Sequence, residues 1–336
     1  MDRGQAGRGG CRALIGRAAR YRTAACLIAG ALGWTAAAAE QPPPLTDLKW
    51  LAAGADPVAA VTAQPAECLG EAADADQRFH MEVGRAAFRN PLLLGGPAAR
   101  SGLSCQTCHL NGRDNPHFFL HGVSGHPGTV DATSALFSKT RGDGLFNPVA
   151  IPSLLDVADK QTFGQAGAVA SLDAFVTGVI VDEFQGAEPP PAVFDGLIAY
   201  LGALRSDACP AHDDQAIRFA SDMADIRRTV DTLDAALDRN DPALADFLVL
   251  AVRGQLGRVH ERFARPQLEA ERLELADLAR ELGDLRRVIT MDGAAARQRL
   301  QAWRVRLDVA ARTLAPAAER SYYDADVLRG MLHATR

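Results

Sequence analysis

Apolar residues recur at helical spacing through much of the chain, most clearly in its last third. Steps of three and four residues predict four amphipathic helices joined by short links. Their apolar faces run over residues 219–237, 244–263, 268–289 and 296–314. Asp241-Pro242 and Asp292 are typical of helix starts, and Pro316 is expected to end the fourth helix. The pattern predicts an antiparallel four-helix bundle over 212–336, with a short fifth helix over 324–333.

The first two thirds of the chain read differently. Helical periodicity predicts helices over 76–88, 172–180 and 192–204, so the fold class is all-α. Residues 110–152 have no sustained period and are rich in Gly, Pro, Asn and His. A segment this long without secondary structure is functional or disordered. It holds Phe118, Phe119, Leu120 and Phe137, which need a large apolar surface to wrap.

The N-terminus has the composition of an export signal. Six arginines precede an apolar run from Ala24 to Trp34, and Ala37-Ala38-Ala39 is typical of a cleavage site. The run is shorter than the ~20 residues of a membrane-spanning helix, although an uncleaved anchor is an alternative. We expect a signal peptide over 1–39, export to the periplasm, and a proline-rich leader segment over 40–67 that packs on the next domain.

Charge limits the partners. Residues 1–39 hold six Arg and one Asp, so the mature chain keeps 30 basic and 40 acidic residues, a net charge of −10. An acidic protein argues against nucleic acid and anionic membranes as partners. It is compatible with a basic redox protein. The mature chain has no predicted membrane span, and the sequence does not indicate an oligomeric state.

The strongest chemical signal is Cys105-Gln106-Thr107-Cys108-His109. Two thiols three residues apart followed directly by an imidazole are the spacing of a haem c attachment site. Cys105 and Cys108 are then the covalent attachment points of one haem c, and His109 is the proximal iron ligand. A redox-active CxxC pair or half of a zinc site are the alternatives. Neither explains the adjacent His, and the chain has no second CxxC.

Cys68 and Cys209 remain once residues 1–39 and the haem have claimed the other four cysteines. They lie just outside the two ends of the haem region. In an oxidising compartment we expect them to form a disulfide that closes a haem domain over 68–209. Two buried free thiols are the alternative.

The second axial position of the iron separates an electron carrier from an enzyme. A loop histidine has the reach for it, and an open position is the alternative. Met223 and Met291 lie on the predicted bundle, where a Met is usually a core residue. Late in the loop, two basic residues could pair with the haem propionates, but an ordinary surface role is preferred for both. The ligand candidates are His117, His121, His126 and Met81, and the basic residues are Lys139 and Arg141.

Three stretches of the haem region resemble one half of the bacterial di-haem cytochrome c peroxidases. They are Gly84-Arg85-Ala86-Ala87-Phe88, Leu103-Ser104-Cys105-Gln106-Thr107-Cys108-His109 and Ile151-Pro152-Ser153-Leu154-Leu155-Asp156-Val157-Ala158. The resemblance covers about residues 76–205 and implies a helical, cytochrome c-like haem domain. It also implies a distal histidine in the loop after the proximal one. Ser124-Gly125-His126 resembles that position, so His126 is the leading candidate.

The chain departs from that family at two points. It has a single CxxCH, whereas the peroxidases need two haems, and it reads Phe163-Gly164-Gln165 where the family has an aromatic-Asp-Gly segment or a ligand Met. We therefore expect a periplasmic mono-haem cytochrome that carries single electrons between redox partners. The alternatives are a peroxidase-like enzyme with a labile His126, and a haem-based sensor or interaction protein that uses the bundle.

The predicted bundle lacks the sequence pattern of a di-iron site. Such sites need Glu-x-x-His on two helices. Gly257 stands three residues before His260, and Gly330 stands three residues before His333. The pattern is absent, and His260 is expected at the surface or the edge of the core.

Overall fold

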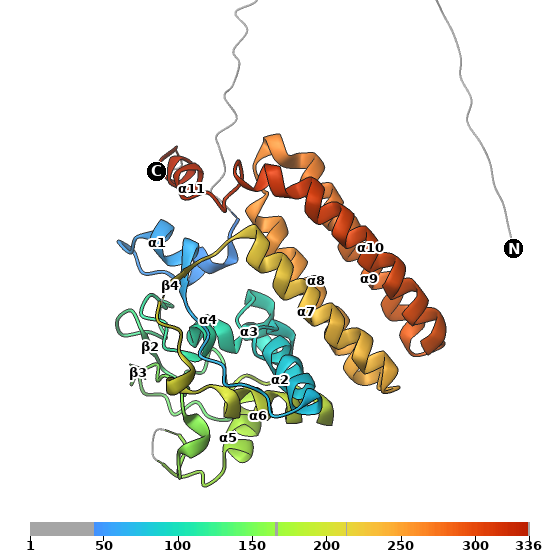
Figure 1. Cartoon of the computed structure of the whole chain (residues 1–336). Coiled ribbons are helices and arrows are strands. Elements are labelled where there is room, and N and C mark those ends of the chain that lie inside the picture. The colour runs from blue at the N-terminus through green and yellow to red at the C-terminus, as the bar shows by residue number, and fades with distance from the viewer. Residues whose placement is uncertain (1–43, 165–166, 213, 335–336) are drawn as a thin grey trace, which may run out of the picture. The chain divides into compact units, whose positions relative to one another are not determined.

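Helices make up most of the computed structural model, which describes residues 44–164, 167–212 and 214–334. This confirms the all-α class (Figure 1). The predicted signal peptide over 1–39 lies outside the described residues. The helices are α1 Pro57–Thr62, α2 Ala75–Phe88, α3 Gly96–Ser101, α4 Cys105–Cys108, α5 Leu172–Gly178, α6 Pro191–Ala203, α7 Phe219–Asp238, α8 Pro242–Arg262, α9 Glu269–Ile289, α10 Gly293–Ala318 and α11 Ala325–Ala334. The strands are β1 Ala63–Pro65, β2 Thr129–Val130, β3 Val149–Ala150 and β4 Asp214–Ala216.

Helices α2 and α6 cross at two glycines. A Cβ built on Gly84 would lie 1.9 Å from the carbonyl oxygen of Gly196, and one on Gly196 would lie 2.6 Å from Cγ1 of Val83. The absence of both side chains lets the two backbones touch. One turn away, the rings of Phe88 and Tyr200 pack with centroids 5.2 Å apart. The crossing places the helix that precedes the CxxCH motif against the last helix of the predicted haem domain.

The four long helices α7 to α10 are called the C-terminal helices below. Each packs against the next, and α10 packs against α7. The predicted caps are confirmed: Asp241 accepts a hydrogen bond from Leu244 N at 2.9 Å, and Asp292 accepts one from Ala295 N at 2.9 Å. The expectation that Pro316 ends α10 is wrong. The helix continues to Ala318, because a proline in the last turn removes one backbone hydrogen bond without ending the coil.

One apolar cluster extends from α2 and α6 into the C-terminal helices. Its members include Val83 and Leu197 on one side and Ile226 and Leu248 on the other, all 1% exposed or less. A separate cluster packs against Cys108 of the CxxCH motif, whereas Cys105 packs against the first cluster. A third joins the leader segment to α11 through Val58, Val61, Tyr322, Leu328 and Met331. The predicted domains therefore share apolar contacts as well as a covalent link.

The leader segment packs on the predicted haem domain, as expected, and also pairs with a strand that follows that domain. Trp50 lies against Phe118 with ring centroids 6.1 Å apart, in the cluster beside the motif. Strand β1 of the leader pairs antiparallel with β4, which follows the predicted haem domain. Three-residue strands carry too little alternation to be recognised from sequence. The pairing joins the two ends of the predicted haem domain beside its cysteines.

Candidate functional site

Cys105 and Cys108 occupy a single turn of helix. The turn begins at a capping box, in which the side chains of Ser104 and Thr107 bond reciprocally with backbone N–H groups. Ser104 N donates to Thr107 Oγ1 at 3.1 Å. Residues three apart lie on the same side of a helix, so both thiols are presented together. Both are free thiols, and neither is fully buried.

The thiols lie in an apolar environment. Burial raises the pKa of Cys105 to about 12 and also raises the pKa of Cys108. A thiol–disulfide exchange centre depends on a stabilised thiolate, and this environment gives the opposite. Cys108 packs against a cluster lined by Trp50, Leu94, Ala98, Leu103, Phe118, Val123, Phe137 and Ile151.

His109 is oriented by the segment that closes the long loop. Its Nδ1 lies 3.0 Å from the carbonyl oxygen of Pro152. Burial lowers the pKa of His109 to about 4, and the hydrogen bond to Pro152 acts in the opposite direction. The imidazole is therefore neutral, with its proton on Nδ1 and its lone pair on Nε2. This is the state in which a histidine ligates a metal, with the second nitrogen fixed by a carbonyl.

Asn111 fixes the turn that follows His109. It adopts a left-handed backbone with φ 51°, which asparagine tolerates better than most residues. Its Oδ1 accepts from Arg89 Nη2 at 2.9 Å and from Gln106 Nε2 at 3.1 Å. Its Nδ2 donates to the carbonyl of Pro65 at 2.7 Å. One buried amide thus links the motif, α2 and the leader segment.

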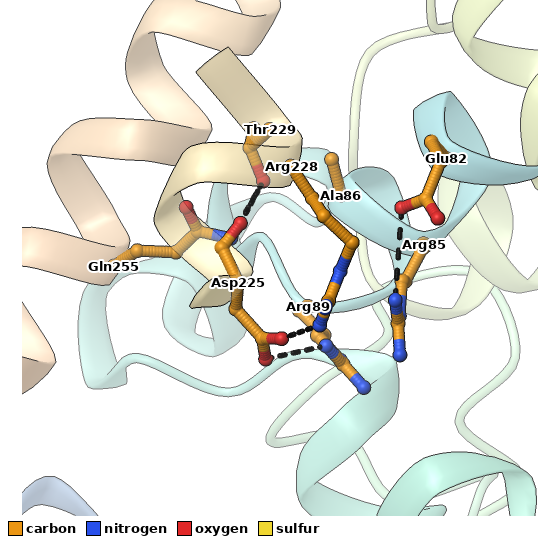
Figure 2. Close-up of a pocket in the computed structure, with 8 residues that line it drawn as sticks. All are labelled: Glu82, Arg85, Ala86, Arg89, Asp225, Arg228, Thr229 and Gln255. Atoms are coloured by element: carbon orange, nitrogen blue, oxygen red, sulfur yellow. Dashed lines mark hydrogen bonds and ion pairs between the residues drawn. The ribbon is translucent and has the colours of Figure 1, made fainter. Parts of the chain in front are cut away.

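A charged network continues from Arg89 to the C-terminal helices. Arg89 pairs with Glu67 and with Asp225 of α7, both at 3.0 Å. Figure 2 shows the carboxylate of Asp225 paired with both Arg89 and Arg228 at a pocket between α2, α7 and α8. The cavity itself is 10 Å³, about the space of one water probe, so it holds no substrate. The charged network around the cavity connects α7 to the motif through Arg89 and Asn111.

His126, the leading distal candidate, lies in a turn of the long loop. The hydroxyl of Thr129 accepts from Gly125 N at 3.0 Å and from His126 N at 3.1 Å. Strand β2 then pairs with β3, which leads directly into Pro152. The turn of His126 and the carbonyl that orients His109 are therefore held by one hairpin. The His126 ring is exposed, with Nδ1 2.9 Å from the carbonyl of Pro127, and its role as iron ligand stays a prediction.

The other ligand candidates are dispersed. His117 and His121 are exposed, and Met81 is buried in α2. Met223 is a core residue at 2% exposure, as its apolar stripe predicted, whereas Met291 is 76% exposed in the link between α9 and α10.

Glu183 is the chemically important residue that sequence reasoning missed. It is 7% exposed and ends a five-residue π-helical turn, Val179–Glu183, that follows α5. Burial raises the pKa of Glu183 to about 7, and the positive charge of Arg141 acts in the opposite direction. Arg141 Nη1 donates to Glu183 Oε2 at 3.2 Å. Arg141 is therefore not the ordinary surface charge that was preferred for it, whereas Lys139 is exposed.

The predicted pairing of Cys68 with Cys209 is confirmed. The sulfur atoms are 2.09 Å apart and the Cα atoms 4.2 Å apart, across 141 residues of sequence. Cys68 lies immediately after the leader segment, and Cys209 follows α6. Both sulfurs lie near the guanidinium of Arg113, at 3.1 and 3.2 Å from Nη2.

Comparisons with protein-family models, with curated proteins and with solved structures found no match to this chain. Within the described ranges, no group of three or more His, Cys, Asp and Glu side chains is arranged to hold a metal ion. Over the same part of the chain, no helix has the length and apolar character needed to cross a membrane.

Proposed function

We propose that this protein is a periplasmic c-type cytochrome with one haem, which carries single electrons between redox partners. The observation that supports this most directly is the pairing of His109 Nδ1 with the carbonyl of Pro152, beside two free thiols on one helical turn. A bare CxxC redox pair has no use for a neutral histidine oriented in this way.

The residues present fit a haem c. Two accessible, protonated thiols are the groups that form thioethers with haem vinyl groups, and His109 offers Nε2 to the iron. The apolar cluster beside Cys108 suits a porphyrin face. When bound, the haem supplies a metal centre that changes its oxidation state by one electron.

Each residue has a distinct task in this proposal. Cys105 and Cys108 hold the group covalently, and His109 binds the iron. Pro152 keeps the histidine in the required tautomer. Trp50 and Phe118 exclude water from one side of the site. His126 is the candidate sixth ligand, which would complete a low-spin centre suited to electron transfer.

At the level of the fold, we propose a cytochrome c-like haem domain over 68–209 and an antiparallel four-helix bundle over 212–336. The glycine crossing of α2 and α6 supports the first assignment. The closed set of contacts among the C-terminal helices, with short links between them, supports the second. The disulfide between Cys68 and Cys209 supports an oxidising compartment and hence the predicted signal peptide.

A peroxidase-like enzyme is the second candidate, and one observation favours it. Glu183 is a buried carboxyl whose raised pKa suits a general acid or base near neutral pH. Peroxide turnover by the purified protein that disappears in both Glu183→Gln and His126→Ala would favour the enzyme. Single-electron exchange without peroxide turnover would favour the carrier.

The test is expression of the full chain in an export-competent host that matures c-type cytochromes. We expect a Soret band that remains with the polypeptide after acid–acetone extraction. Cys105→Ser with Cys108→Ser should abolish it, and His109→Ala should alter the spin state of the retained haem. His212→Ala is the matched control, because His212 is an exposed histidine outside the motif and outside the long loop and should leave the spectrum unchanged. A wild-type protein without covalent haem would contradict the proposal.

A further inference from the structure

The side chain of Glu183 is largely buried, so its carboxylate form loses most of its hydration. Its side chain is 10% exposed, against 33% for its partner Arg141. The π-helical turn that carries it is a rare backbone form often found at functional sites. Buried carboxyl groups with a specific charge partner are enriched at functional sites.

Two segments place Glu183 at the haem region. The hydroxyls of Ser138 and Thr140 donate to the carbonyl of Asp182 at 2.8 and 3.0 Å. The rings of Phe137 and Phe184 pack with centroids 5.2 Å apart. Phe137 is a member of the apolar cluster against which both Phe184 and Cys108 pack. Residues 137–141 and 182–184 therefore form one wall beside the attachment turn.

Few charged groups act on this carboxyl. Arg141, from the loop, is the cation that faces it, and Asp182 is an exposed neighbour on its own turn. From α4, Cys105 and Cys108 sense its charge, since Glu183 raises the pKa of both thiols. Once converted to thioethers, these two sulfurs no longer titrate. A charge that acts on both attachment sulfurs also acts on a porphyrin bound to them.

We propose that Glu183 takes up a proton when the haem iron accepts an electron, so that the protein transfers a proton together with each electron. In the step, ferric haem, ionised Glu183, one electron from a one-electron donor and one proton from water give ferrous haem and neutral Glu183. When the acceptor oxidises the haem, the electron passes to the acceptor and the proton of Glu183 returns to water. The electron places negative charge near the carboxylate and favours its protonation. This inference rests on the proposed haem function.

The direction of the pH dependence follows from the linkage between proton binding and reduction. A neutral Glu183 stabilises the reduced state relative to an ionised one, so the reduction potential rises as pH falls through the pKa of the carboxyl. The raised pKa of about 7 places the response near neutral pH. Full coupling changes the reduction equilibrium tenfold per pH unit, which is about 59 mV for one electron.

The experiment is spectroelectrochemical titration of the haem-loaded protein from pH 5 to pH 9. Wild type should show a potential that falls with pH through the neutral range, by up to tenfold in the equilibrium per unit. Glu183→Gln should lose this slope, and its potential should exceed that of wild type at pH 9 but match it at pH 5. Asp182→Asn, the exposed neighbouring carboxylate, is the matched control and should keep the slope. Arg141→Gln should move the response to higher pH.

Wild type alone also provides a test, in case the variants fold poorly. Redox-difference infrared spectra at pH 7 should show a carboxylic acid C=O band that appears on reduction. A haem protein that cycles normally but keeps its slope in Glu183→Gln, or that shows no such band, overturns this inference and leaves the haem function intact. A protein without haem instead contradicts the proposed function.

Discussion

Replacement of Gly84 by alanine tests whether the crossing of α2 and α6 holds the predicted haem domain together. The new Cβ would lie 1.9 Å from the carbonyl oxygen of Gly196 and 2.6 Å from Cβ of Tyr200. Ordinary carbon–oxygen contacts are about 3.3–3.6 Å, so the helices must separate by more than an ångström. The obstacle is backbone rather than the flexible end of a side chain, and it cannot move aside cheaply.

The magnitude follows from opposing effects. Alanine gains about 0.5–1 kcal/mol over glycine within a helix. Overpacking a close contact costs about 1–3 kcal/mol and occasionally more. Separation also loosens the buried pair Phe88 and Tyr200, which are 1% and 0% exposed. With about 0.5–1.5 kcal/mol for the loosened aromatic pair, we expect a net destabilisation of roughly 1–3 kcal/mol.

Urea unfolding followed by circular dichroism measures this change. Gly202→Ala is the matched control, because Gly202 lies in α6 and a Cβ there would have no neighbour within 4 Å. It should stabilise the protein by about 0.5–1 kcal/mol. If Gly84→Ala proves as stable as Gly202→Ala, the close crossing is refuted.

Two further predictions concern links between parts of the chain. Cys68→Ser with Cys209→Ser opens a closed loop of 141 residues and should lower the free energy of unfolding by roughly 4–5 kcal/mol, measured by denaturant unfolding without reductant; an unchanged midpoint would show that the bond contributes nothing. Arg89→Ala removes one of the two cations that pair with Glu67 and with Asp225, and one of the donors to Asn111 Oδ1, so it should cost roughly 2 kcal/mol. Arg227→Ala, which breaks an exposed pair, should cost no more than about 1 kcal/mol in the same assay, and equal losses in the two variants would contradict the assigned role of Arg89.

The helices were largely predictable from sequence because their signals are local. Asp241 and Asp292 identify helix starts by residue type alone, and both cap as expected. The end at Pro316 was misjudged, since a proline excludes only one hydrogen bond and α10 could extend by half a turn. The pairing of Cys68 with Cys209 was predictable from elimination and compartment rather than from geometry.

The parts that could not be predicted depend on contacts between distant residues. The hydrogen bond from His109 to Pro152 spans 43 residues, and the pairing of β1 with β4 spans about 150. The importance of Glu183 arises from burial and from Arg141, 42 residues earlier. Its only local signal is a single glutamate in the otherwise largely apolar run from Val179 to Phe184, preceded by Asp182.

The most direct measurement is the mass of the tryptic peptide over residues 101–113, taken from protein exported and matured in a cytochrome c-producing host. This peptide contains Cys105, Cys108 and His109 and no other cysteine. We predict that it carries one covalently bound haem. The same peptide recovered with both thiols unmodified would contradict the proposal that this chain is a c-type cytochrome.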